Sequence, residues 1–174
     1  MSRHATCIFF VVLLATLSRA HAGKPHCTLR VHVEANANDS EVFATTMRSA
    51  VTGKKIVMEK VPRISEQDVA AFYPYQGANG SYGVLLRLND HGRLALDTLS
   101  VERRGAYVYV FVNRRPVSEM QIDRHITDGQ LYLASGLTQN DLALMGKDWR
   151  VIGRNKSSKS QTPSSKEMPN LKFQ

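Results

Sequence analysis

Cys27 and Ser135 are the two side chains that we consider as candidate nucleophiles in this sequence. His26 precedes Cys27, and a neighbouring histidine can activate a thiol by lowering its pKa. Adjacent side chains of a strand point to opposite faces, however, so His26 is badly placed for this task. The serine-hydrolase pattern G-x-S-x-G does not occur, and Asn79–Gly83, which comes nearest, is typical of a turn. We therefore predict no catalytic residue.

Metal and nucleotide chemistry also lack their usual patterns. His91 and His125 are isolated in the sequence, whereas zinc ligands usually occur in local pairs such as H-x-x-x-H or C-x-x-C. The carboxylates lie mostly near arginines or in caps and turns, which favours solvated surface charge over acid–base chemistry. Neither a P-loop nor a Rossmann glycine pattern is present. The sequence predicts no metal ligand, no cofactor and no nucleotide partner.

Two arginine pairs are candidates for contact with a partner. The pair Arg103-Arg104 is expected at the end of a helix, where the helix dipole favours cations. The pair Arg114-Arg115 is expected at the tip of a hairpin, where no structural role requires a positive charge. We therefore predict that Arg114 and Arg115 contact an anionic group or a protein partner.

The first 22 residues have the three parts of a secretory signal peptide. A basic start precedes an apolar run from Ile8 to Ala15, and Ala20-His21-Ala22 places small residues where signal peptidase requires them. The run covers about 10 to 12 residues, and a membrane-spanning helix needs about 20. We expect cleavage between Ala22 and Gly23, no transmembrane segment in the remaining chain, and export to the periplasm or out of the cell.

Removal of residues 1–22 would take Cys7 away and leave Cys27 without an internal disulfide partner. A leftover cysteine in an oxidising compartment is either buried or free for an intermolecular bond. Cys27 opens an alternating apolar strand, which favours burial. The remaining chain is too short for two ordinary domains, so residues 23–153 are expected to form one.

The basic charge belongs largely to the C-terminus. The formal net charge of +8 falls to +6 without Arg3 and Arg19, and residues 154–174 hold five cations against one acid. This stretch is rich in Ser, Lys and Pro and has no apolar periodicity, so we expect a disordered tail. A solubilising role is its simplest function, and weak contact with an anionic surface is the alternative.

Apolar periodicity predicts strands and helices between these ends. A short helix is expected to begin at Ser65 and to end before Pro74, because Ser65 and Asp68 are spaced as a capping box. Further elements are expected over the following ranges: strands at 27–34, 84–88, 107–112, 117–122 and 130–134, weaker apolar stretches at 41–46 and 55–59, a helix at 93–103 capped by Asn89, and a helix opened by Thr138 and Asp141. The fold class is therefore α+β, with a mainly antiparallel sheet of about four to six strands and two or three helices packed on one face.

Short segments between Ile64 and Trp149 carry a family resemblance. They are Ile64-Ser65 with Asp68-Val69, then Gly83–Leu88 followed by His91-Gly92-Arg93, then the hairpin Tyr109–Val117, and finally Ile126–Gly129 with Leu133–Thr138. In their order and spacing they resemble the head subdomain of the first periplasmic domain of SecD, a subunit of the bacterial SecDF protein-export complex. The resemblance covers about half of the chain.

Two departures from that family stand out. The family's hairpin commonly turns through Asp-Gly, whereas this chain has Asn113-Arg114; arginine tolerates a positive φ poorly, so we expect a longer turn or another type. SecD itself has transmembrane helices and this sequence predicts none, so a role in driving translocation does not follow.

The resemblance implies an exported, non-enzymatic module that binds another protein or an unfolded polypeptide segment, added at a sheet edge. The alternative is a small secreted hydrolase or thiol enzyme centred on Cys27 or Ser135.

Overall fold

The computed structural model describes residues 26–36, 38–77 and 80–153. The predicted cleavage site at Ala20, Ala22 and Gly23 and the predicted tail at 154–174 lie outside these residues. The elements run in the order β1 Leu29–Val33, β2 Ala44–Arg48, β3 Lys55–Glu59, β4 Ile64–Ser65, η2 Glu66–Asp68, β5 Val69–Gln76, β6 Tyr82–Leu88, α2 Asp90–Glu102, β7 Tyr107–Val112, β8 Arg115–Gln121, β9 Gln130–Leu137, α3 Gln139–Asp148 and β10 Arg150–Val151.

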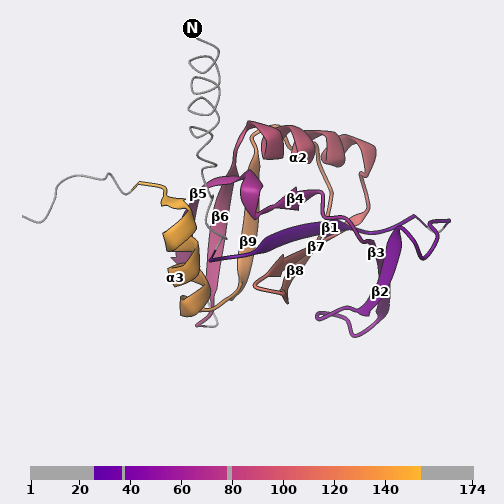
Figure 1. The fold of residues 1–174 in the computed structure, drawn as a ribbon, viewed down its shortest axis with the longest axis horizontal. Helices are drawn as coiled ribbons and strands as arrows, with labels where there is room; N and C mark the ends of the chain where they lie inside the picture. Colours follow the sequence, from indigo (N-terminus) through magenta and orange to yellow (C-terminus); the bar gives the residue numbers. More distant parts are fainter. Residues whose placement is uncertain (1–25, 37, 78–79, 154–174) are drawn as a thin grey trace, which may run out of the picture.

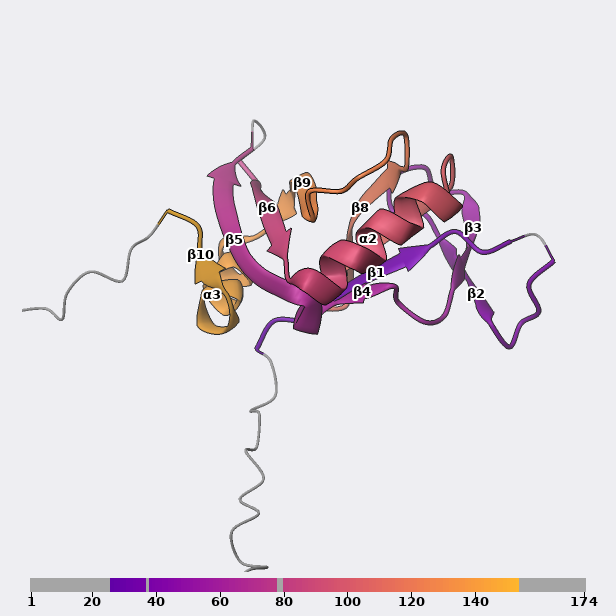
Figure 2. The same cartoon turned by 90° about the horizontal axis from the view of Figure 1, so that it is seen from above.

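The strands form two four-stranded sheets and a separate two-stranded arm. The first sheet has the order β4-β1-β7-β8, the second has the order β10-β5-β6-β9, and β2 pairs only with β3. Every described pair is antiparallel except β10 with β5. In both views the arm lies at one end of the molecule and α3 lies at the other (Figures 1 and 2).

One hydrophobic core joins the two four-stranded sheets. Its buried side chains alternate along the strands, as in Leu29, Val31 and Val33 of β1, and they include Met145 of α3 and Leu96 of α2. Trp149 follows α3 and meets Phe72 of β5 edge-to-face, with ring centroids 6.4 Å apart. Burial of these aliphatic and aromatic surfaces is the main force that stabilises the domain.

The predicted α+β class and the mainly antiparallel pairing are confirmed, but the arrangement differs from the expected single sheet. Strands are divided among three sheets, and α2 and α3 lie along different sides of the domain rather than on one face (Figure 1). The arm stays separate because its strands bury little: only Ala44 and Met58 are buried in β2 and β3. Two weakly apolar strands have too little to gain from joining a larger sheet.

The helix predicted to begin at Ser65 is wrong beyond its first turn. The Ser65–Asp68 capping box forms, but it closes only the 3-10 turn η2, after which β5 begins at Val69. Pairing with β6 buries Val69 and Phe72, and this long-range gain outweighs a local helix signal. Pro74, expected to end a helix, lies instead in β5.

The hairpin between β7 and β8 contradicts the expected longer turn. Val112 pairs with Arg115, so the loop has only Asn113 and Arg114, and their φ angles are 50° and 65°. Positive φ at both loop residues matches the right-handed twist of the strands. The Asn113 N–H donates to the carbonyl of Thr28 at 2.9 Å and its side chain accepts from the Thr28 N–H at 3.1 Å. These bonds hold the turn despite the strain at Arg114.

Replacing Arg114 with glycine should stabilise the protein. Glycine adopts positive φ without a Cβ clash, and this relief exceeds its extra unfolded-state entropy, so we expect a gain of about 1 kcal/mol in urea denaturation. Arg124→Gly is the matched control, because Arg124 is exposed and has no positive φ. Equal or lower stability of Arg114→Gly would mean that the turn relaxes without strain.

Candidate protein-docking surface

The arm formed by β2 and β3 and its flanking residues carries an unusual amount of exposed apolar surface. Half of the large hydrophobic side chains exposed in the described residues belong to it: Val42 at 71%, Phe43 at 69%, Val51 at 73%, Val57 at 40% and Val61 at 73% exposed. The rest are scattered over other elements. Phe43 and Val61 line one hollow and Val57 lines another. Exposed apolar side chains gathered on one element of a soluble domain are a candidate interaction site.

The arm is fixed to the domain at two places, so its surface has a defined position. The Ala35 N–H donates to the carbonyl of Val57 at 3.0 Å, beside a bridge between Glu34 and Met58. At the other place Glu119 of β8 accepts from the Ser49 hydroxyl at 2.7 Å and from the Ala50 N–H at 2.9 Å. A two-stranded sheet is marginal by itself, so these contacts give the arm its stability.

Charged side chains are arranged differently at the tip and at the base of the arm. Arg48, Lys54 and Lys55 are exposed where β2 ends and β3 begins, and within the described chain no carboxylate forms an ion pair with them. At the base, Glu59 accepts from Arg63 at 2.7 and 3.0 Å, and this hydrogen bond raises the pKa of Arg63. The tip therefore carries exposed positive charge that no described carboxylate pairs with. At the base, Lys60 is exposed too, and its ammonium donates to the carbonyl of Glu41.

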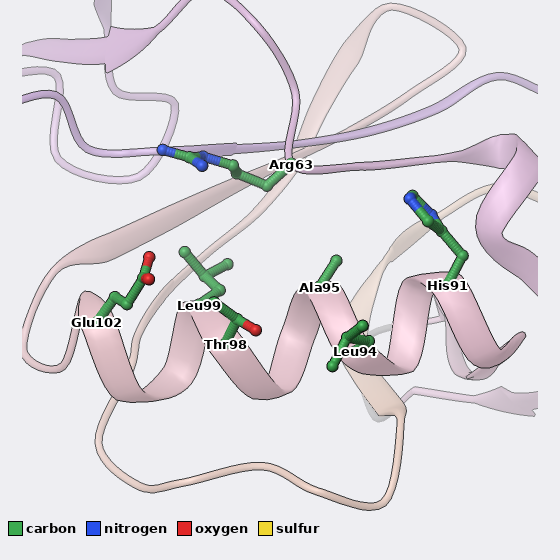
Figure 3. A pocket seen from close by; sticks show the side chains of 7 residues that line it. All are labelled: Arg63, His91, Leu94, Ala95, Thr98, Leu99 and Glu102. Carbon is green, nitrogen blue, oxygen red and sulfur yellow. The ribbon is translucent and has the colours of Figure 1, made fainter.

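A shallow groove of about 270 Å³ lies beside the base of the arm along α2. Figure 3 shows Arg63 above the helix, with Glu102 near one end and His91 near the other. The remaining lining is mostly apolar: Leu94, Ala95, Thr98 and Leu99. Because Arg63 is already paired with Glu59, the groove offers apolar contact rather than an anion site.

The predicted partner residues Arg114 and Arg115 differ in their surroundings. The guanidinium of Arg115 donates to Asp141 at 2.5 Å, which compensates its charge. Arg114 is exposed at the hairpin tip, and no described side chain pairs with it. Of the two, only Arg114 has a guanidinium that no described carboxylate pairs with. Its contact with a partner stays a prediction.

The two candidate nucleophiles are not brought together. Cys27 is fully buried, as the sequence predicted, while Ser135 is half-buried on β9. Burial and the carboxylates of Asp141 and Asp148 raise the pKa of the Cys27 thiol to about 12. His26 is turned to Asp148 instead, with its ring Nδ1 at 2.7 Å from a carboxylate oxygen. An environment that suppresses the thiolate suits a structural cysteine.

His91 and His125 likewise lie next to carboxylates. His91 contacts Asp68 with Nδ1 2.7 Å from a carboxylate oxygen, and His125 contacts Asp97. Among the described residues, no group of three or more His, Cys, Asp and Glu side chains is arranged to hold a metal ion.

Sequence analysis missed an aromatic row on the outer face of the second sheet. Tyr73, Leu85 and Tyr132 are cross-strand neighbours, and Tyr73 and Tyr132 are 50% and 57% exposed. The ring of Tyr75 lies across Gly83, stacks on Tyr132 with centroids 5.3 Å apart, and donates to the carbonyl of Leu133 at 2.6 Å. Tyr73 and Tyr75 are two residues apart, so their spacing could have indicated that both lie on one face of a strand.

The arm was missed for a different reason. Val42, Val51 and Val61 fall in connecting segments, where an apolar residue has no periodic partners that would mark a surface. The stretches at 41–46 and 55–59 were recognised only as weak strands, and their pairing with each other decides which side chains remain exposed.

Solved structures share this arrangement of sheets and helices. A crystal structure of SecDF in a super-membrane-facing form aligns with 72% of this chain at a TM-score of 0.51 and 14% identity. The domain has a SecDF-like fold. A second SecDF structure, described as a membrane component that enhances protein export, aligns with 71% at a TM-score of 0.49 and 15% identity. The resemblance predicted from the sequence is thus confirmed as a likeness of fold.

The match covers only part of this chain and only part of each SecDF chain. The chain spans 19% of the first SecDF chain and 63% of the second. No protein-family model and no curated protein matches the sequence. The part of the chain that the structure describes contains no helix with the length and apolar character needed to span a membrane.

Proposed function

We propose that this chain is an exported, non-enzymatic domain that binds protein in association with protein export. The exposed apolar surface of the arm, from Val42 to Val61, is the observation that carries the proposal. Leaving large apolar side chains in water is unfavourable, and burial against a partner recovers about 25 cal/mol for each Å² removed from water. The partner is a protein because apolar side chains beside strand backbone complement another polypeptide.

The SecDF-like fold supports the association with export, since SecDF is a membrane component that enhances protein export. In this proposal residues 1–22 are a signal peptide, residues 23–153 form the domain, and residues 154–174 are a basic tail that contacts anionic surfaces weakly. The domain then works in the periplasm or outside the cell. Arg114 adds a cationic contact at the opposite hairpin.

A secreted hydrolase or thiol enzyme is the competing function. Its strongest candidate, Cys27, is buried beside two carboxylates that oppose thiolate formation. Ser135 lies on the same domain without a described histidine hydrogen-bonded to it. Nucleophilic catalysis needs a base within hydrogen-bond reach of the nucleophile, so binding is the better-supported function.

Binding can be tested with a reduced, carboxymethylated protein that remains unfolded in native buffer. Replacing Phe43 and Val57 together by serine removes apolar contact without adding charge. We expect the dissociation constant, measured by fluorescence anisotropy, to rise at least about tenfold, since each buried side chain contributes about 1.5–3 kcal/mol.

Val101→Ser is the control, because Val101 is also exposed by 60% but lies on α2 and not on the arm. It should leave the affinity unchanged. No measurable binding by the wild type, or an equal loss in both variants, would refute the arm as the docking surface.

A further inference from the structure

The free edge of β2 is the feature that suggests how a partner binds. In an antiparallel pair, residues alternate between those bonded across the pair and those whose backbone groups point outward. The Lys60 N–H donates to the carbonyl of Phe43 at 2.8 Å, and the Ser49 N–H donates to the carbonyl of Lys54 at 2.9 Å. The register fixes the alternation between these ends.

It follows that Thr46 and Arg48 point their backbone N–H and C=O groups away from β3. Val57, opposite Thr46, confirms the pattern, because its carbonyl points outward on the other side and accepts from Ala35. Ala44 also points outward, but its N–H is already bonded to the carbonyl of Ser40 at 3.1 Å. Among the described residues no strand pairs with this side of β2. An edge with unpaired donors and acceptors is a template for another strand.

The edges of the two four-stranded sheets are protected, and the outer edge of β2 is not. At β5 the side facing β10 includes Pro74, which has no N–H to donate. The long edge strand β8 lies against β9, where a Cβ on Gly136 would come 3.0 Å from the carbonyl oxygen of Val117. The strands β4 and β10 have two residues each. β2 has five residues, no proline and no register shift.

We propose that β2 receives an extended polypeptide segment as an added strand, and that this segment has apolar side chains flanked by acidic ones. The inference rests on the protein-binding function proposed above and specifies its partner and mode. Phe43, which directly precedes β2, supplies apolar contact near the start of the new strand, while the basic tip at Arg48, Lys54 and Lys55 attracts its carboxylates. Val57 lies on β3, one strand further from the partner. Main-chain bonds give affinity and the flanking side chains give selectivity.

Amide hydrogen exchange on the full chain tests the register directly. The probe is a labelled synthetic peptide with alternating valine and threonine and aspartates at both ends. Its binding should slow the exchange of the Thr46 and Arg48 amides at least about tenfold. Thr45 and Met47, whose groups face β3, should change little. Added salt should weaken binding because the contact charges are exposed.

Thr46→Pro removes the outward N–H while leaving the bonds between β2 and β3 intact, so it should abolish peptide binding. Thr46→Val is the matched control; it keeps the N–H and should bind as the wild type does. If Thr46→Pro prevents folding, the hydrogen-exchange pattern of the wild type with the peptide still tests strand addition.

Three results would overturn strand addition. The first is uniform protection without alternation between neighbouring amides. The second is normal peptide binding by Thr46→Pro. If the Phe43 and Val57 double variant then fails to bind, the proposed protein-binding function is retained and only binding by strand addition is wrong. The third is protection of Thr46 and Arg48 without peptide, because a second copy or another part of this chain would already occupy the edge.

Discussion

Replacing Asp141 with alanine should lower the free energy of unfolding by about 3 kcal/mol, because it breaks a helix cap together with buried charged hydrogen bonds. Asp141 is only 3% exposed. Its carboxylate accepts from the N–H and hydroxyl of Thr138 at 2.9 and 2.7 Å, from Asn113 at 2.7 Å and from Arg115 at 2.5 Å. One side chain thereby fastens the β7–β8 hairpin to the start of α3.

Urea denaturation followed by circular dichroism measures this loss. Asp123→Ala is the matched control, since Asp123 is exposed and only its carbonyl is bonded, to Arg104. It should change stability by less than about 0.5 kcal/mol. Asp141→Asn should fall between the two, as an amide oxygen still accepts but carries no charge for Arg115. A loss of the size seen in the control would show that the hairpin and helix are held independently.

The effect should depend on pH in one direction. Burial opposes the charge of Asp141, but bonds from Thr138 and Asn113 and the charge of Arg115 outweigh it, so its pKa lies below the usual value. A group whose folded pKa is depressed stabilises the fold fully above its unfolded pKa of about 3.9 and loses that contribution as pH falls further. The difference between wild type and Asp141→Ala should be constant near neutral pH and shrink in acid. The pKa values of Asp68 and Asp148 are lowered too, which adds to acid sensitivity.

Local sequence signals predicted an element correctly where its side chains are also buried in the way that those signals indicate. Thr138 and Asp141 indicated a helix start, and the same capping box opens α3; Asn89 likewise caps α2 by accepting from the Gly92 N–H. The alternation of Val84, Leu86 and Leu88 matches the buried face of β6. In these segments the local preference and the tertiary burial agree, so periodicity alone was sufficient.

Prediction failed where distant partners decide the outcome. Ser65 and Asp68 have the same capping pattern as Thr138 and Asp141, yet only a single turn forms before β5. A capping box reports the preference of four residues, while strand formation here depends on β6, which begins at Tyr82. The turn at Arg114 was also mispredicted, because its strain is offset by Thr28, far away in the sequence.

The candidate surface was harder to predict than the fold. The exposure of Val57 depends on which strand pairs with β3. No local sequence pattern indicates that one edge of β2 has no strand paired with it among the described residues. The buried state of Cys27 could be predicted because it precedes an alternating strand. Its two acidic neighbours could not, since Asp141 and Asp148 come from α3, more than a hundred residues later.

The thiol of Cys27 should react with iodoacetamide at least about a hundredfold more slowly than a small-molecule thiol at pH 7.5. A pKa of about 12 reduces the thiolate fraction about three thousandfold relative to a free cysteine of pKa near 8.5, and burial also denies access to the reagent. Labelling of Cys27 in the folded protein can be followed by mass spectrometry, with the urea-unfolded protein as the reference for full reactivity.

Unfolding should restore the ordinary rate, because both burial and the carboxylates of Asp141 and Asp148 are then lost. Asp148→Asn separates these two causes: it removes one negative charge near the thiol, while an amide oxygen can still accept from the Cys27 N–H. It should raise the rate modestly, and burial should keep the rate well below the unfolded reference. Rapid labelling of the folded wild type would remove the physical case against a thiol enzyme, since only a thiolate exposed near neutral pH attacks a substrate. Slow labelling would agree with the proposed protein-binding function, in which Cys27 has a structural role.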